Sequence, residues 1–371
     1  AGTSTNMNAN EVIANIGLEL LGHKKGEYQY LHPNDHVNLS QSTNDAYPTA
    51  LRLALHDYLS DLAKAMEHLK TAYEKKAKEF KNVLKMGRTQ LQDAVPMTLG
   101  REFQTFAVMM GEDIERVLEA RKLVLEINLG GTAIGTGINS HPDYPKVVEK
   151  KLREVTKHDY VVAEDLIEAT QDTGAYVQIS GVLKRVATKL SKVCNDLRLL
   201  SSGPKCGLNE INLPKMQPGS SIMPGKVNPV IPEVVNQVCY YVIGADMSVT
   251  FACEGGQLQL NVFEPVAAYS LFNSITMLEK AMKTLADKCI DGITANEKVC
   301  SDFVYNSIGI VTALNPYIGY ENSASIAKEA LNTGKRVYDL ALERGLLSKK
   351  ELDEILTPEN MLNPHMTKKR N

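Results

Sequence analysis

Apolar residues recur at helical spacing in three long segments of the chain. Steps of three and four place side chains on one face of a helix, so each segment predicts a long amphipathic helix. The segments carry Leu51, Leu55, Tyr58, Leu62, Ala65 and Leu69; Leu99, Phe103, Phe106, Met110, Val117 and Val124; and Ile179, Leu183, Val186, Leu190, Val193, Leu197 and Leu200. Helices with stripes this long bury them against one another, which predicts a helical bundle.

Two further apolar stretches, 234–249 and 262–285, follow a segment rich in glycine and proline. Patterns typical of β-strands joined by tight turns are scarce. After residue 298 the pattern changes to shorter helices, with breaks at Asn315-Pro316, Gly319, Gly334, Gly345 and Pro358. The sequence therefore predicts an all-α fold with a long central bundle over 44–298 and a small C-terminal helical domain over 299–371. The basic residues at 368–370 are interpreted as a solvated tail.

Charge and composition exclude several classes of function. The 371 residues hold 41 Lys+Arg and 44 Asp+Glu, a net charge of -3. Nucleic-acid and polybasic membrane roles need a positive excess, so we expect neither partner. No apolar run reaches the roughly 20 residues that cross a bilayer, and no signal-peptide pattern is visible, so cytoplasm is the expected location. Six cysteines without a C-x-x-C pair predict buried free thiols. No H-x-x-x-H pair falls in a predicted helix, so no catalytic metal is expected.

Four polar segments interrupt the helical pattern: 2–8, 40–45, 87–90 and 219–229. Their hydroxyl and amide side chains are compact hydrogen-bonding groups, and several precede long helices, whose N-termini favour anions. Plainer interpretations stay open. Ser42, Thr43 or Asn44 would serve as a helix cap, Arg88 as an ion-pair partner, and Gly130–Gly137 as a turn.

The fourth segment as a whole favours binding of a small molecule. It combines two serines, Ser220 and Ser221, with Lys226 in a loop rich in glycine and proline, a composition common in loops that close over substrates. A serine nucleophile needs a histidine base. No G-x-S-x-G motif and no flanking histidine is present, which argues against Ser-His-Asp hydrolysis.

Residues 219–229 resemble the signature G-S-S-x-M-P-x-K-x-N of the aspartase/fumarase superfamily, and the resemblance covers essentially the whole chain. Within the superfamily, 40–48, 87–92 and 228–238 are most similar to the aspartate ammonia-lyases. Gln90 stands where fumarases usually have histidine. The alternatives are a class II fumarase on the same scaffold and a non-catalytic helical scaffold derived from the family.

The resemblance implies a reversible anti elimination of ammonia from L-aspartate, which gives fumarate through an aci-carboxylate intermediate. Ser220 would be the general base. The β-carboxylate would be held by Thr3, Ser42, Thr43 and Ser221, and the α-carboxylate by Thr89, Lys226 and Asn228, with Gln90 nearby. Asn44, with help from Thr3, would contact the amino group.

Two roles stay open in this comparison. Glu233 matches an acid that partners the histidine replaced by Gln90, so its role is unassigned, as is the acid that protonates the leaving group. His32–Asp35 resembles a secondary anion site of fumarases, although a plain turn is the favoured interpretation.

The resemblance also implies a homotetramer whose active sites are shared between subunits. No cofactor is required, and Mg²⁺ activation, known in some relatives, is an open expectation. Residues 1–43 correspond to the end of an N-terminal domain, so we expect most of that domain to be missing from this chain.

Overall fold

The computed structural model describes residues 2–362, which form two compact units. Unit 1 comprises residues 2–67, 111–192 and 234–283, and unit 2 comprises 68–110, 193–233 and 284–362. The predicted tail at 368–370 lies outside the described residues. The long helices contribute residues to both units, because the chain passes from one unit to the other within them.

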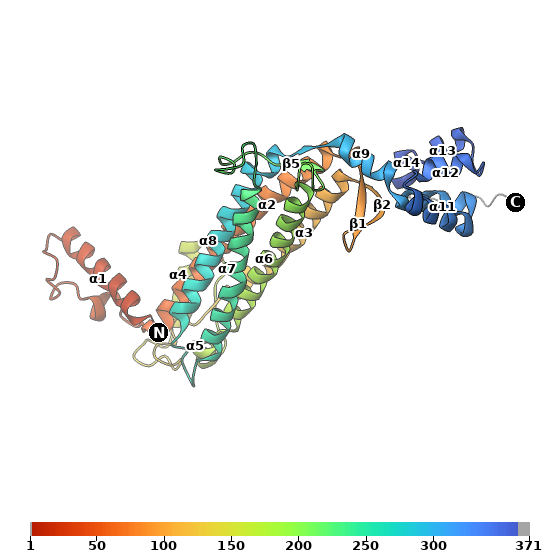
Figure 1. The fold of residues 1–371 in the computed structure, drawn as a ribbon. Helices are drawn as coiled ribbons and strands as arrows, with labels where there is room; N and C mark the ends of the chain where they lie inside the picture. Colours follow the sequence, from red (N-terminus) through yellow and green to blue (C-terminus); the bar gives the residue numbers. More distant parts are fainter. Residues whose placement is uncertain (1, 363–371) are drawn as a thin grey trace. The chain divides into compact units, whose positions relative to one another are not determined.

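The three predicted long helices are confirmed, and the two further apolar stretches also form long helices (Figure 1). They are α2 (Thr43–Glu79), α3 (Leu99–Arg121), α6 (Gly174–Leu200), α7 (Val230–Glu254) and α8 (Glu264–Lys288). Nearly all residues of the three predicted stripes are buried, as the spacing requires; Tyr58 is the exposed exception. The second stripe extends past its helix, since Lys122–Val124 form a separate 3-10 turn, η2, in which Val124 is buried.

In unit 1, charged and polar pairs with buried carboxylates join the helices. Asp246 of α7 accepts hydrogen bonds from Ser180 Oγ (2.8 Å) and Lys184 Nζ (2.5 Å) of α6. Arg185 of α6 donates to Asp113 of α3 at 2.9 Å. The shorter elements of this unit are α1 (Thr3–Leu20), η1 (Pro33–Val37), β3 (Glu126–Ile127), α4 (Tyr144–Thr156), β4 (Val161–Val162) and α5 (Leu166–Gln171).

Unit 2 contains a hairpin and a set of short helices that share one apolar core. Leu84 and Met86 of the hairpin are buried with Val304, Leu314 and Leu340. The elements are β1 (Leu84–Thr89), β2 (Gln92–Thr98), β5 (Ile211–Asn212), η3 (Ile290–Gly292), β6 (Thr294–Ala295), α9 (Glu297–Asn306), η4 (Ile308–Ile310), α10 (Val311–Ile318), α11 (Tyr320–Thr333), α12 (Val337–Glu343), α13 (Lys349–Ile355) and α14 (Pro358–Leu362). β1 pairs with β2, and β5 with β6, both antiparallel.

Three features differ from the sequence-based expectations. The fold is mostly helical, but residues 84–98 form an antiparallel hairpin that the apolar pattern did not predict. The expected break at Asn315-Pro316 is wrong, because Pro316 lies inside α10, which ends before Gly319 at φ 81°. Proline lacks a backbone N–H and so removes one helical hydrogen bond. Burial of Leu314 and Ile318 on either side of Pro316 offsets that loss. The first polar segment is not a loop, since α1 begins at Thr3.

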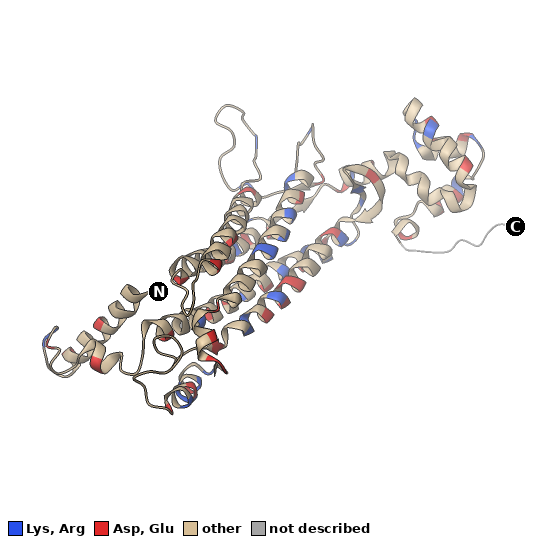
Figure 2. Ribbon diagram, turned by 90° about the horizontal axis from the view of Figure 1, so that it is seen from below, with Lys and Arg blue, Asp and Glu red and all other residues tan. Residues whose placement is uncertain are grey.

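Basic and acidic residues are interspersed along the helices (Figure 2), which agrees with the small net charge. Residues 2–362 include no helix with the length and apolar character that crossing a bilayer requires.

Candidate active site

The sequence-predicted site residues lie in three places. Thr3, Ser42, Thr43 and Asn44 belong to unit 1, whereas Thr89 and Gln90 lie on the hairpin of unit 2 and Ser220, Ser221, Lys226 and Asn228 on its loop before α7. None of them belongs to a cluster of metal-ligating side chains within residues 2–362.

In unit 1, the first turns of α1 and α2 are joined. Asn6, one turn after Thr3, donates hydrogen bonds from Nδ2 to Thr43 Oγ1 (3.1 Å) and to Asn38 Oδ1 (3.3 Å). Gly2, at φ 80°, sits so close to the Tyr47 ring that a Cβ would lie 2.7 Å from it. This approach requires glycine, and together with the Asn6–Thr43 hydrogen bond it holds the start of α1 against the start of α2.

Ser42 caps α2, so the helix-cap interpretation is confirmed. Its Oγ accepts from the Asn44 backbone N–H at 3.2 Å, as an N-cap side chain does, and its own N–H donates to Asp45 Oδ1 at 2.9 Å. The Asn44 side chain donates from Nδ2 to the Ala133 carbonyl at 2.7 Å. That bond orients the Asn44 side-chain amide. Its Oδ1 atom can accept a hydrogen bond, as binding of a substrate ammonium group would require.

Asp45 is a residue that the sequence reasoning missed. It is fully buried, and its Oδ2 accepts from the backbone N–H groups of Gly130 (3.0 Å) and Thr132 (2.9 Å). Burial raises the pKa of this carboxyl, and the backbone hydrogen bonds oppose that rise. The segment 130–137 is thus a turn whose amides bind a carboxylate of the chain itself, which confirms the turn interpretation.

In unit 2, Gln90 occupies the tip of the β1–β2 hairpin. Thr89 pairs with Gln92, so Gln90 and Leu91 form a two-residue turn, with φ values of 54° and 62°. Such turns favour Asn-Gly, because two side-chain-bearing residues at positive φ are strained. Strained residues cluster at functional sites. Thr89 and Gln90 are both exposed at this tip.

A buried ion network anchors this hairpin. Arg88 Nη1 donates to Glu210 Oε1 at 2.7 Å, and Lys85 Nζ lies 3.0 Å from Glu210 Oε2 and also pairs with Glu102. Glu210 is fully buried, and the Arg88 guanidinium lies 5.4 Å from the centre of the Phe303 ring. Arg88 is therefore an ion-pair partner that fixes the strand next to Thr89, as the plainer interpretation predicted.

The loop 219–229 holds Ser220 in a distinct environment. Its Oγ accepts from the backbone N–H groups of Ile222 (3.3 Å) and Met223 (3.2 Å). Donors aimed at a hydroxyl oxygen favour its deprotonated form. Gly219 is required here, because a Cβ would lie 2.0 Å from the Lys226 carbonyl oxygen. Gly219 and Lys226 therefore lie in close contact across the loop.

A pocket of about 850 Å³ lies within unit 2, beside this loop. Lys226, Asn228 and Glu233 line it, together with two cations that the sequence reasoning did not single out, Arg198 and Lys215. Thr89, Gln90, Ser220 and Ser221 are absent from the described lining. Three cations against one carboxylate make this pocket suited to a small anion.

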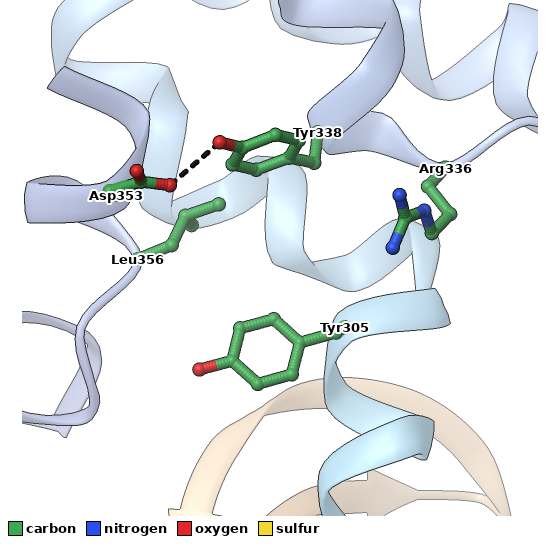
Figure 3. A pocket seen from close by; sticks show the side chains of 5 residues that line it. All are labelled: Tyr305, Arg336, Tyr338, Asp353 and Leu356. Atoms are coloured by element: carbon green, nitrogen blue, oxygen red, sulfur yellow. Dashed lines mark hydrogen bonds between the residues drawn. The ribbon is translucent and has the colours of Figure 1, made fainter. Parts of the chain in front are cut away.

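Two other pockets lack these features. One of about 260 Å³ in the C-terminal helices is shown in Figure 3, where Tyr338 Oη donates to Asp353 at 2.6 Å. Its Arg336 forms two hydrogen bonds with Asp339 (2.8 and 3.0 Å), so that guanidinium is already paired. The other, of about 710 Å³ in unit 1, is lined by four carboxylates, which disfavour a dicarboxylate: Glu126, Glu164, Asp165 and Glu168.

The six cysteines are free, as predicted. Cys194, Cys239, Cys289 and Cys300 are buried, and burial raises the pKa of the last three to about 12. Burial was the wrong expectation for Cys206, which is exposed, and Cys253 is only partly buried.

Comparisons with known proteins identify the family. Residues 1–244 match a family model described as Lyase, and residues 310–363 match one described as Fumarase C C-terminus. An aspartate ammonia-lyase of Helicobacter pylori is 70% identical over 369 residues, which are 100% of this chain and 79% of that protein. One of Escherichia coli is 60% identical over 370 residues, 100% of this chain and 77% of that protein.

Solved structures agree. A fumarate lyase:delta crystallin from Brucella melitensis, bound to cobalt, superimposes with a TM-score of 0.96 at 54% identity, over 98% of this chain and 79% of that one. A class II fumarase from Schistosoma mansoni gives 0.92 at 36% identity, over the same shares. The chain therefore belongs to the lyase family of the aspartase/fumarase superfamily.

Proposed function

We propose that this chain is an aspartate ammonia-lyase, which eliminates ammonia reversibly from L-aspartate to give fumarate. The observation that carries the proposal is identity of 60–70% over the whole chain to relatives with that name. The cationic pocket lined by part of the signature loop supports an anionic substrate.

Ser220 is the proposed general base, which takes the C3 proton. A serine hydroxyl is a weak base unless its alkoxide is stabilised. The N–H groups of Ile222 and Met223, 3.3 and 3.2 Å from Oγ, supply such stabilisation. Lys226, in the same loop, adds positive charge. Closure of the loop over substrate would exclude water and strengthen both effects.

Removal of the C3 proton puts additional negative charge on the β-carboxylate, which becomes an aci-carboxylate. We assign Thr3, Ser42, Thr43 and Ser221 to that group, since donors placed where charge develops lower the barrier, each by about 3–4 kcal/mol. Thr89, Lys226 and Asn228 would hold the α-carboxylate, with Gln90 nearby. Asn44 would accept from the amino group through Oδ1. The acid for the leaving ammonia and the role of Glu233 stay unassigned.

A homotetramer with shared active sites is proposed for the assembly. Tyr240, Met247 and Phe251 of α7 are exposed and spaced by seven and four, so they form one apolar stripe. Val266 and Tyr269 of α8 are exposed in the same way. Stripes of this size on helices mark protein interfaces, and packing them between subunits would build a shared helical core.

The first test follows fumarate by its ultraviolet absorbance. L-aspartate should yield fumarate, whereas L-malate should not. Fumarate from malate but not from aspartate would favour the fumarase alternative, and no product from either would favour the non-catalytic scaffold. Repeating the assay with added Mg²⁺ after chelation tests metal activation, and fractionation of the source cells tests the cytoplasmic location.

The second test addresses the residues. Ser220→Ala should lose nearly all turnover while light scattering still reports a tetramer, and wild-type kcat would refute the base assignment. Lys226→Ala should mainly raise KM. Thr3→Val and Ser220→Ala, each inactive, should regain activity when their subunits are mixed, because mixed tetramers would contain some intact sites. A mixture that stays inactive would contradict sites shared between subunits.

A further inference from the structure

Two histidines and an aspartate meet in unit 1, away from the proposed substrate residues. His56 and Asp57 lie in α2, and His158 lies in the segment between α4 and β4. One ligand atom from each lies within 4.8 Å of the others. At about 1.5 Å per residue, His56 is about 20 Å along α2 from Thr43. The cluster is therefore separate from the substrate-binding end of that helix.

The interatomic distances are close to those of a coordination shell. His56 Nδ1 lies 3.6 Å, and His158 Nε2 3.9 Å, from Asp57 Oδ1. Metal–ligand bonds of about 2.1 Å place neighbouring ligands of a tetrahedral ion about 3.4 Å apart. The two imidazole rings already touch, with centroids 4.3 Å apart. The two separations from Asp57 Oδ1 exceed that value by about 0.2 and 0.5 Å.

The chemistry of the three side chains indicates which ion they suit. His56, which is buried, and His158 each offer one imidazole nitrogen. Asp57 is exposed and supplies the negative charge that a dication needs. Two imidazoles with one carboxylate favour zinc, cobalt or nickel over Mg²⁺, which prefers oxygen ligands.

One neighbouring group opposes a cation. Arg121 Nη2 lies 3.4 Å from His56 Nδ1, and Arg121 Nε donates to the His56 carbonyl at 3.2 Å. The guanidinium thus occupies the direction that an ion would take, through one long contact. A bound metal would replace that contact, and removing the guanidinium should strengthen binding. Substitution of Arg121 should therefore raise the metal affinity, whereas substitution of a ligand should lower it.

We propose that His56, Asp57 and His158 bind one divalent transition-metal ion of the zinc or cobalt type. The ion would connect α2 to the segment that follows α4, about 100 residues later in the chain. Closing a loop of that length constrains the unfolded chain, so binding would stabilise the folded state. The site would be structural, since it lies far along α2 from the substrate motifs.

The experiment uses the full-length protein after treatment with EDTA and buffer exchange. Zn²⁺ is titrated by calorimetry and Co²⁺ by its visible absorption, which reports the ligand set without reference to activity. Wild type should bind one ion per chain with a visible Co²⁺ spectrum. His158→Ala and Asp57→Asn, both on accessible side chains, should weaken binding by about tenfold or more. Arg121→Gln should strengthen it severalfold.

The matched control is His141→Ala. His141 and Asp143 form an exposed pair at 3.8 Å but have no third ligand among residues 2–362, so that variant should bind as wild type does. Equal stoichiometry and affinity in wild type and His158→Ala would overturn the proposal, as would the absence of a Co²⁺ spectrum in wild type. A loss in His141→Ala equal to that in His158→Ala would also overturn it, because general surface binding would then explain the titration.

Discussion

The substitution Glu210→Gln removes one negative charge from a buried network and keeps the size of the side chain. In the folded protein, this carboxylate faces two cations, Arg88 at 2.7 Å and Lys85 at 3.0 Å. The glutamine would keep one acceptor oxygen, but its NH₂ group is a donor and would face either Arg88 or Lys85, which are also donors. Lys85 would retain Glu102, and Arg88 would lose its carboxylate.

The magnitude follows from distance and burial. At about 3 Å and an effective dielectric constant of about 20, each contact contributes about 5 kcal/mol of Coulomb attraction, much of which offsets desolvation. Removing one partner of a buried pair costs about 3–5 kcal/mol, because the remaining charge is left uncompensated. The hairpin that carries Thr89 and Gln90 should therefore open more often. A loss of about 3 kcal/mol corresponds to opening about a hundredfold more frequent.

Hydrogen exchange of peptides covering residues 84–98 measures this opening directly. The matched control is Asp302→Asn, which breaks the exposed Lys298–Asp302 pair of α9 (2.7 Å). Exposed pairs contribute about 0–1 kcal/mol, so the control should leave exchange in the hairpin unchanged. Exchange in Glu210→Gln within about threefold of wild type would refute the reasoning, since it would mean that the network does not hold the hairpin.

Further predictions concern the loop, the thiols and one buried acid. Gly219→Ala should abolish most of kcat/KM in the fumarate assay, because a Cβ would lie 2.0 Å from the Lys226 carbonyl oxygen; Gly181→Ala, with no atom within 4 Å, is the control and should stay active. Of the six thiols, Cys206 should react first with Ellman's reagent in the folded protein and all six after denaturation, since Cys206 is exposed; rapid reaction of Cys239 or Cys289 would contradict the burial of these two thiols. Burial raises the pKa of the Glu264 carboxyl to about 7, above its unfolded value of about 4.5, so the folded state binds the extra proton between these values. This acid should therefore cost about 3 kcal/mol of stability as pH rises from 5 to 8. The free energy of unfolding of Glu264→Gln, measured in urea, should not show that decline with pH. If the free energies of variant and wild type change in parallel with pH, the raised pKa of Glu264 is refuted.

Much of this protein is determined by the sequence itself. The long helices were predictable because the helical period of 3.6 residues is a local property that neighbouring residues display. The cap at Ser42 and the requirement for glycine at position 219 are also local. The signature loop indicates the family from sequence alone, because its serines, Lys226 and Asn228 occur together in one short segment.

The hairpin at 84–98 was not predictable in the same way. Its turn is Gln90-Leu91 instead of an Asn-Gly type, and β1 begins with three consecutive buried residues instead of an alternating pattern. Its conformation is held by the C-terminal core and by Glu210, which is 122 residues away from Arg88 in sequence. Tertiary contacts therefore override the local signal here.

The tertiary structure alone decided which distant polar groups meet. It joined Asp45 to the amides of Gly130 and Thr132, and it brought Arg198 and Lys215 to the pocket of Lys226. It also placed His158 beside His56, a pair that no spacing rule finds because 101 residues lie between them. The physical reason is the same in each case: sequence periodicity fixes which face of a helix is buried, whereas the partner of a buried charge or ligand depends on how the whole chain folds.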